Sequence, residues 1–275
     1  MCKSMPKIFV TLLCIFLAPH LAISQESFPS IASQYQPEIK LIVIDPGLGG
    51  GKFGAAACDS EVSASDINLQ ISKQVAERLE DLNLKVVLTR DDDTDPSLEQ
   101  RASIANANQA DLFISISVNT SEKPSASGIE SFYLNLTTDT EAIQGEATKN
   151  TDKSKDTDDM LSIFLDLMQS SKLQESEILA KNIQNELFRQ MSEKHSTVID
   201  RGIKQAPFYL LMATQMPAVA IYPGFLTNPH ECKLLASSDY QKQISIGIVT
   251  GLQSFINERR TQPINVADPK NRSAN

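Results

Sequence analysis

The feature that most constrains the fold is a regular alternation of strand-like and helix-like stretches in the first half of the chain. Runs rich in β-branched and apolar residues occupy Lys40–Ile44, Lys85–Thr89 and Leu112–Val118. Between them lie a segment with apolar residues at helical spacing, Asp66–Leu82, and a second predicted helix after Pro96. This alternation predicts an α/β fold, a mainly parallel twisted β-sheet with helices on both faces.

The second half adds further predicted elements. Strands are expected at Ile129–Leu136 and Ala218–Tyr222, with a short extended piece at Pro207–Leu211. Helices are expected at Asp159–Gln169, Glu175–Met191 and Tyr240–Ile256.

Length and composition set the domain organisation. With 275 residues, 41% of them hydrophobic, the chain can bury one core but is short for two full domains. We expect one domain at residues 40–258, after a linker at 25–39, with a tail at 259–275 that is polar and expected to be disordered. Residues 137–175 begin with a Thr-, Lys- and Asp-rich stretch of little periodicity and are expected to form a mobile insertion.

The first 24 residues are typical of a signal peptide. Lys3 and Lys7 precede the apolar run Ile8–Ala18, and Ala22-Ile23-Ser24 is a small-x-small cleavage site. The alternative, an uncleaved membrane anchor, needs about 20 apolar residues, and this run is shorter. The protein is therefore expected to be exported, periplasmic or secreted, with no membrane span after cleavage.

Charge and cysteine usage narrow the partners. A formal net charge of −9 and the lack of a basic run argue against nucleic acid. After cleavage, Cys58 and Cys232 remain, and an oxidising compartment permits a disulfide between them. Two free, partly buried thiols are the alternative.

Three predicted strands end in stretches that carry polar residues, and two of the three stretches contain glycine. They are Asp45-Pro46-Gly47-Leu48-Gly49-Gly50, Ser115-Ile116-Ser117-Val118-Asn119 and Ile221-Tyr222-Pro223-Gly224-Phe225. Together with Ile67-Asn68-Leu69, Arg201-Gly202 and Gly224-Phe225-Leu226-Thr227-Asn228-Pro229, they make the chain resemble the zinc-dependent N-acetylmuramoyl-L-alanine amidases, which cut stem peptides from peptidoglycan. The resemblance runs from about Lys40 to Ile256, and it implies the same fold and a site at these loops.

The resemblance also implies where the chemistry of the family would lie. In that family a histidine, a glutamate and a second histidine hold the zinc, and a further glutamate is the general base. Here the ligand positions are Leu48, Ala64 and Ser117, and the position of the base is Tyr222. Leucine and alanine offer zinc no donor atom, and a tyrosine with a pKa near ~10 is a poor base at neutral pH. We therefore predict that the chain binds no zinc and is catalytically inactive.

Two rescues of activity are the alternatives. Relocated zinc ligands could come from six side chains near the same edge: Cys58, Asp59, Glu61, Asp66, His230 and Cys232. A hydrolase built on Ser117 would need a nearby base, and neither His195 nor His230 falls at a strand end. We further expect the ring of Tyr222 to pack on Leu48 where the metal would lie.

What remains favours recognition. Residues that shape the fold persist, including Asn68 and Gly224-Phe225, which predicts a protein that binds peptidoglycan, or cell-wall amidases and their activators. Asn119 and Arg201 are the expected groove residues, with structural hydrogen bonding as their alternative role. Residues 137–175 occupy the place of a regulatory helix in cell-division members of the family. A regulatory protein-interaction module without wall affinity is the remaining alternative.

Overall fold

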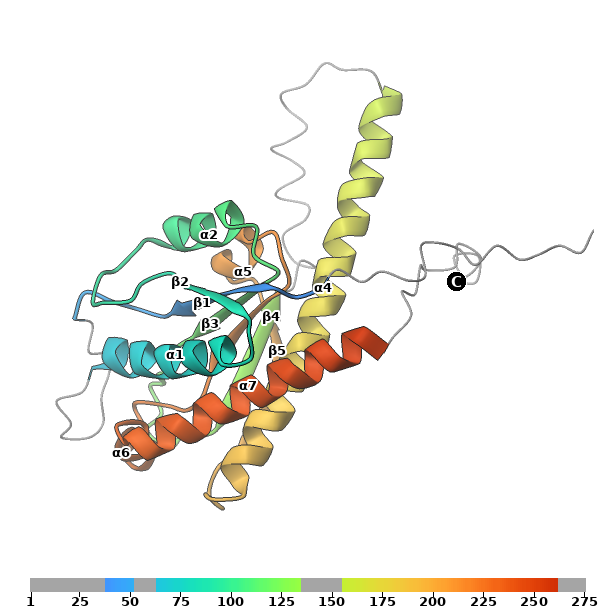
Figure 1. Cartoon of the computed structure of the whole chain (residues 1–275). Coiled ribbons are helices and arrows are strands. Elements are labelled where there is room, and N and C mark those ends of the chain that lie inside the picture. Colours follow the sequence, from blue (N-terminus) through green and yellow to red (C-terminus); the bar gives the residue numbers. More distant parts are fainter. Residues whose placement is uncertain (1–37, 52–62, 135–154, 262–275) are drawn as a thin grey trace, which may run out of the picture. The chain divides into compact units, whose positions relative to one another are not determined.

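The computed structural model describes residues 38–51, 63–134 and 155–261, with side chains from residue 170 onward in the last range. Among these residues, six strands form one sheet in the order β2-β1-β3-β6-β4-β5 (Figure 1). All neighbouring strands are parallel except β4 and β6. The strands are β1 (Leu41–Pro46), β2 (Lys85–Leu88), β3 (Leu112–Ile116), β4 (Ile129–Leu134), β5 (Asp200–Ala206) and β6 (Ala218–Tyr222). The predicted fold class is confirmed.

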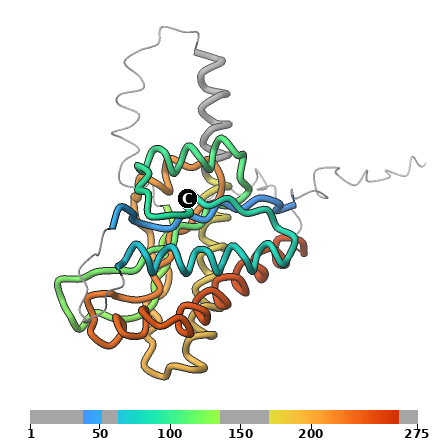
Figure 2. The backbone as a smooth tube through the Cα atoms, turned by 60° about the vertical axis from the view of Figure 1, so that its left-hand side comes forward, coloured from blue at the N-terminus to red at the C-terminus, as the bar shows by residue number. Residues whose placement is uncertain are grey.

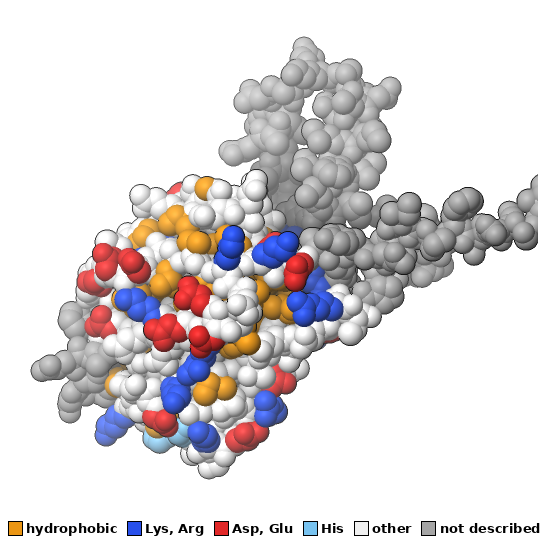
Figure 3. Space-filling model, in the orientation of Figure 1, with side chains coloured by type: hydrophobic (Ala, Val, Ile, Leu, Met, Phe, Trp, Pro, Cys, Tyr) orange, Lys and Arg blue, Asp and Glu red, His pale blue; other side chains and the backbone are white. Residues whose placement is uncertain are grey.

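Helices cover both faces of the sheet, as Figures 1 and 2 show from two directions. One face packs against α1 (Ala64–Glu80), α4 (Lys155–Ser192) and α7 (Ser238–Thr261), whose apolar side chains share a core cluster with those of the strands. The other face packs against α2 (Leu98–Ala107) and α5 (Tyr209–Ala213) in a second cluster. The short α6 (Pro229–Leu235) follows β6. Figure 3 shows acidic and basic side chains interspersed over the face that carries α1 and α7.

Local sequence explains where the first two helices begin. Ser63 and Asp66 form a capping box at α1, and Ser97 and Gln100 form another at α2. In each, the serine hydroxyl accepts the N–H of the third helical residue, whose side chain accepts the serine N–H in return. These caps fix the start of α1 and α2 beside the carboxyl ends of β1 and β2.

Two expectations in the second half of the chain were wrong. The helices predicted at Asp159–Gln169 and Glu175–Met191 are one helix, α4, so the expected insertion at 137–175 is helical from Lys155. The stretch between them contains no glycine or proline to interrupt a helix, and the Ser176 hydroxyl donates to the carbonyl of Lys172 one turn earlier.

Pro207–Leu211 is not an extended piece. The strand lies earlier, at β5, and pairs with β4 across a register shift between Ile129 and Ser131. Chain from Tyr209 onward is helical in α5. Tertiary pairing at the sheet edge overrides the short polar pattern of β5, which carries no clear strand signal.

Several predictions fall wholly or mainly outside the described residues. These are the signal peptide at 1–24, most of the linker at 25–39, the first part of the insertion, and the tail beyond residue 261, while α7 extends to Thr261. Among the described helices, none is long and apolar enough to cross a membrane.

Candidate functional site

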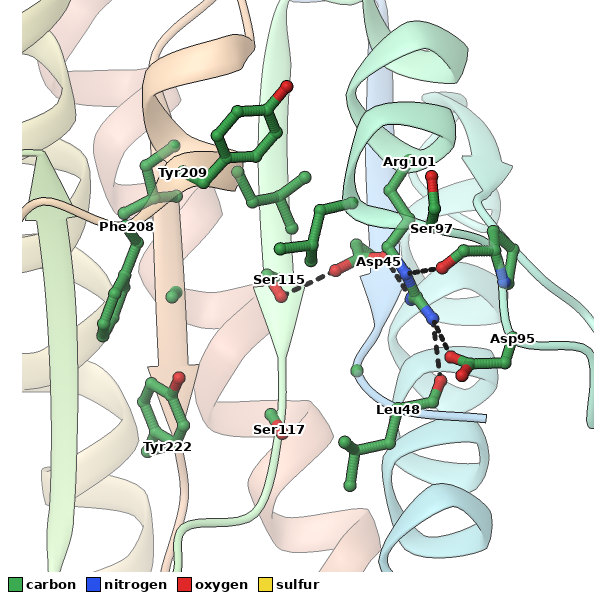
Figure 4. A pocket seen from close by; sticks show the side chains of 16 residues that line it. Asp45, Leu48, Asp95, Ser97, Arg101, Ser115, Ser117, Phe208, Tyr209 and Tyr222 are labelled. Atoms are coloured by element: carbon green, nitrogen blue, oxygen red, sulfur yellow. Dashed lines mark hydrogen bonds and ion pairs between the residues drawn. The ribbon is translucent and has the colours of Figure 1, made fainter. Parts of the chain in front are cut away.

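The sheet order brings three predicted strand ends together. Strand β3 pairs with β1 on one side and with β6 on the other, all parallel, so their carboxyl ends share one edge. At this edge Leu48, Ser117 and Tyr222 line a single pocket of about 540 Å³ (Figure 4). The structure therefore gathers three of the four positions singled out in the sequence.

Ala64 occupies a different place. It is the first residue of α1, is buried in the core cluster under that helix, and is not among the residues that line the pocket. Its neighbour Ser65 still belongs to the edge, because the Ser65 carbonyl and the Gly47 carbonyl both accept from the Arg90 guanidinium. The start of α1 is thus tied to the loop after β1.

A buried polar network forms one side of the pocket. The Asp45 carboxylate, 1% exposed, accepts from the hydroxyls of Thr89 at 2.6 Å and Ser115 at 2.8 Å and from the Arg101 guanidinium at 2.7 Å. Such a carboxylate is stable in the interior because its oxygens are paired and hydrogen-bonded. Asp45 is therefore a structural group with its acceptors already engaged.

Arg101 also fixes the loop that carries Leu48. Its guanidinium donates to the carbonyls of Pro46 and Leu48 at 2.8 and 2.9 Å and forms an ion pair with Asp95 at 3.2 Å. Leu48 has a φ of 59°, a left-handed conformation that costs a leucine about 1–2 kcal/mol. The contacts of Arg101 hold the backbone there despite the strain.

The loop after β1 and the end of β3 approach closely at Gly47. A Cβ on Gly47 would come within 2.8 Å of the Ser117 side chain, so glycine is required. Asn68 joins the same two segments: its amide donates to the Gly47 carbonyl and the Ser117 hydroxyl, and its side-chain oxygen accepts the Val118 N–H. The scaffold of the edge is fully hydrogen-bonded around Ser117.

Tyr222 and Leu48 share the pocket, but other side chains hold the ring. The Tyr222 ring packs edge-on against Phe132, with centroids 5.4 Å apart, and near Phe208 at 6.4 Å. Leu48 packs against the core cluster on the other face of the sheet. Figure 4 shows the two side chains on either side of Ser117. Burial, with the nearby carboxylates of Glu130 and Asp45, raises the pKa of the Tyr222 hydroxyl, so the group is a neutral proton donor at neutral pH.

Asn119 and Arg201 meet at a carboxylate that the sequence did not single out. Glu130, 4% exposed, accepts from the Asn119 amide, from the Arg201 guanidinium at 2.6 Å and from the Lys204 ammonium. Burial acts to raise the pKa of Glu130, but hydrogen bonds from Lys204 and Arg201 hold it below its usual value. We call Asn119, Glu130, Arg201 and Lys204 the polar cluster.

The polar cluster adjoins the pocket without lining it. Glu130 is the register partner of Tyr222 between β4 and β6, and the Lys204 ammonium lies 5.6 Å from the centroid of the Phe132 ring on which Tyr222 packs. Arg201 lies over the Phe225 ring at 5.0 Å, with about a third of its side chain exposed. Within the polar cluster two cations share one carboxylate, and the neighbouring Glu231 carboxylate also acts on Arg201.

The side chains considered as relocated metal ligands have other roles where they are described. Asp66 closes the capping box of α1, and His230 lies 3.4 Å from the Thr197 hydroxyl on the surface. Cys232 is buried and disulfide-bonded, and its partner lies outside the described residues, so the pairing with Cys58 stays a prediction. Cys58, Asp59 and Glu61 lie in the gap at 52–62. Within the described ranges, no group of three or more His, Cys, Asp or Glu side chains is placed to hold a metal ion.

The outer wall of the pocket was missed in the sequence. The lining includes Phe208, Tyr209, Leu210 and Leu211 after β5, and Pro96 and Leu98 at the start of α2. Tyr209 and Leu98 are 42% and 49% exposed at its rim. The sequence signal was the aromatic pair directly after Pro207, which we assigned to an extended segment.

Comparison with known proteins places the fold in one class, the cell-wall amidases. Residues 42–254 match the N-acetylmuramoyl-L-alanine amidase family, and the chain belongs to this family. The uncharacterized protein YqiI of Bacillus subtilis is 32% identical over 221 residues, covering 80% of this chain and 87% of YqiI. Amidase AmiC of Neisseria meningitidis is 30% identical, covering 87% of this chain and 58% of AmiC.

A solved structure agrees with the sequence relatives. The N-acetylmuramoyl-L-alanine amidase from Clostridium difficile 630 superposes with a TM-score of 0.61 at 32% identity, covering 80% of this chain and 98% of that one. The sequence-based resemblance to this family is thus confirmed.

Proposed function

We propose that the chain is a non-catalytic member of the amidase family that is exported and binds peptidoglycan through the pocket and the polar cluster. The observation that carries the proposal is the chemistry of the lining where the family resemblance places zinc ligands and a base. Leu48 supplies no donor atom, and Ser117 and Tyr222 supply only hydroxyls. These residues do not fit a zinc ion, which is held by thiolate, imidazole or carboxylate ligands.

The carboxylates beside the pocket do not replace the missing donors. Asp45 is hydrogen-bonded to Thr89 and Ser115 and ion-paired with Arg101, and Asp95 is paired with the same guanidinium. Moving either carboxylate onto a metal would break one of the ion pairs of the buried Arg101, which costs free energy. Tyr222, a neutral hydroxyl, is unsuited to take a proton from water.

Retention of the scaffold supports binding over loss of function. The strained Leu48 backbone, the close approach at Gly47 and the Asn68 bridge are all kept around a pocket without the chemical groups. Strain of this kind persists only where surrounding contacts hold it in place. The polar cluster beside Tyr222 offers partly exposed cations to the carboxylates of wall peptides.

A protein partner is the second candidate. Among the relatives, the CwlD amidase from Clostridioides difficile has been solved in complex with the GerS lipoprotein, and it superposes on this chain with a TM-score of 0.60 at 29% identity. On this alternative the chain would bind a wall amidase or its activator without affinity for the wall itself.

The decisive experiment measures zinc content, hydrolysis and wall binding on one preparation. The purified mature protein is assayed for zinc by mass spectrometry, then incubated with purified sacculi with and without added zinc. No zinc, no released stem peptides and co-sedimentation with sacculi are expected. Zinc with stem-peptide release would mean relocated ligands and an active amidase. If no stem peptides are released and the protein does not co-sediment with sacculi, the result favours the protein-partner alternative.

Charge variants localise the binding. Arg201→Ala and Lys204→Ala should each weaken co-sedimentation with sacculi, because each removes one cation from the polar cluster. Arg189→Ala is the matched control, since Arg189 is exposed on α4 in ion pairs with Glu186 and Glu193. Equal loss in the control would mean non-specific charge attraction.

A further inference from the structure

The pocket at the edge of the sheet has a shape and charge that point to a ligand class of its own. Its volume of about 540 Å³ lies within the ~300–1,000 Å³ of pockets that bind small molecules. Small residues on the strands make it deep: Gly47 on the loop after β1, Ser115 and Ser117 on and after β3, and Ala220 on β6. Side chains of ordinary size at these positions would fill it.

The walls are mostly apolar. The apolar side chains on the lining are those of Leu48, Leu98, Phe208, Leu210 and Leu211. Figure 4 shows Phe208 and Tyr209 on the side of the pocket opposite Arg101 and Asp95. Exposed apolar rim residues next to a formed pocket are typical of ligand sites. An apolar group entering here exchanges water for contact with aromatic and aliphatic side chains.

The charged groups that line the pocket pair with one another. Arg101, 3% exposed, is ion-paired with Asp45 and Asp95, and the Arg90 guanidinium also acts on both carboxylates. The carbonyls of Pro96, Pro46 and Leu48 accept from Arg101 as well, so an incoming anion would find no uncommitted guanidinium on this lining. The pocket therefore disfavours carboxylates, in contrast to the polar cluster beside it.

Neutral hydrogen-bonding groups line the pocket at the ends of β3 and β6. The Tyr222 hydroxyl stays protonated at neutral pH, and the Ser117 hydroxyl has a long contact of 3.3 Å with the Asn68 amide and another of 3.5 Å with the Val118 carbonyl. Both residues lie at the end of the pocket opposite Tyr209 (Figure 4). They can serve a neutral acceptor such as an amide carbonyl.

We propose that this pocket binds an uncharged aromatic or aliphatic group carrying one amide-like acceptor, which lies against Tyr222 and Ser117. The inference rests on the proposed non-catalytic function, because a metal ion with its ligands would occupy the same end. It assigns the pocket to the neutral part of a ligand and leaves anionic parts to the polar cluster.

A matched series of fragments tests the assignment: 2-phenylacetamide, phenylacetate and 2-phenylethylamine, titrated by NMR into the full mature protein. Phenylacetamide should bind. Phenylacetate should bind at least about tenfold more weakly, because its carboxylate would lose hydration without gaining a partner. Equal binding of the amide and the carboxylate, or tighter binding of the amine, would overturn the neutral assignment. No binding of the amide would also overturn it.

Variants tie the binding to the pocket. Ala220→Leu fills the floor and should abolish amide binding, whereas Ala107→Leu, the same change on the exposed end of α2, should leave it intact. Should Ala220→Leu fail to fold, Tyr222→Phe is the second variant, expected to weaken the amide several-fold by removing one hydroxyl. If folded Ala220→Leu binds phenylacetamide as wild type does, the fragment lies elsewhere and the inference is rejected. The same holds for Tyr222→Phe where it serves as the second variant.

Zinc content of the same sample separates the two proposals. A protein with bound zinc and hydrolytic activity would reject the proposed function whatever the fragments do. If the protein is zinc-free and inactive but does not bind phenylacetamide, only the inference about the neutral ligand is rejected.

Discussion

Arg101 and Asp45 form a salt bridge of 2.7 Å at the side of the pocket, with side-chain exposures of 3% and 1%. The same guanidinium holds the Leu48 carbonyl at 2.9 Å, so one buried ion pair connects α2, β1 and the loop of the candidate site. Loss of this ion pair should lower the free energy of unfolding and weaken ligand binding in the pocket.

Arg101→Met should destabilise the protein by about 3–5 kcal/mol, because it leaves the Asp45 carboxylate buried without its cation. Urea unfolding followed by circular dichroism measures the change. Arg189→Met, which breaks exposed ion pairs on α4, is the control and should cost well under ~1 kcal/mol. Similar losses in the two variants would contradict the role of the buried pair.

Gln109→Gly should stabilise the protein by about 0.5–1 kcal/mol. Gln109 follows α2 with a φ of 50° and is exposed, in a Schellman motif in which the Ala110 N–H donates to the Ala105 carbonyl. Glycine adopts this conformation without strain. Thermal unfolding measures the gain. Ser103→Gly, on the exposed face within α2, should instead lose about 0.5 kcal/mol, and a loss at both positions would argue against the left-handed turn.

Lys172 should make stability rise with pH in the alkaline range. Burial lowers the pKa of this lysine to about 8, and its ammonium donates to the carbonyls of Leu211 and Thr214. Because the unfolded chain keeps the proton up to an ordinary pKa near ~10.4, it binds more protons than the folded state between these values. The free energy of unfolding therefore gains a positive contribution as pH rises from about 8 to about 10.

Urea unfolding of wild type and Lys172→Met from pH 7 to pH 10 isolates this contribution. The difference in unfolding free energy between the two proteins should move in favour of wild type as pH rises through the folded pKa. Lys181→Met, which removes an exposed lysine from the same helix, is the matched control. A flat difference for Lys172→Met would mean that the lysine is solvated.

Adding donor atoms to the lining of the pocket should create a zinc site. The combined variant Leu48→His, Ser117→His and Tyr222→Glu is expected to bind about one equivalent of zinc, because it places two imidazoles and one carboxylate on the lining of the pocket. Histidine also tolerates the left-handed backbone at position 48 better than leucine does. Mass spectrometry of the metal content provides the measurement, with stem-peptide release from sacculi as a second readout.

The same variant without Ser117→His is the control and should bind zinc much more weakly, since one ligand is missing. A folded triple variant without zinc would mean that the three substituted positions do not converge on one ion.

Local sequence alone determined the elements whose signals are strong over a few residues. The alternation from Lys40 to Val118 and the run Ala218–Tyr222 predicted β1, α1, β2, α2, β3 and β6. The spacing of apolar residues along the chain indicates which helix face or which strand is buried. The sequence also shows the residue types at positions 48, 64, 117 and 222, and the side chains of Leu48 and Ala64 cannot gain donor atoms by folding.

Only the tertiary structure decided what lies between these elements. Strand order placed β3 between β1 and β6, which turned three separate loops into one pocket wall. It brought Phe208 and Tyr209 across from α2 and joined Asn119 and Arg201 on Glu130, contacts between residues far apart in the chain. It also merged two predicted helices into α4 and gave β5 its strand, because pairing and packing outweigh weak local preference. The fold class was thus set by local patterns, and the shape and charge of the site by long-range contacts that no local pattern records.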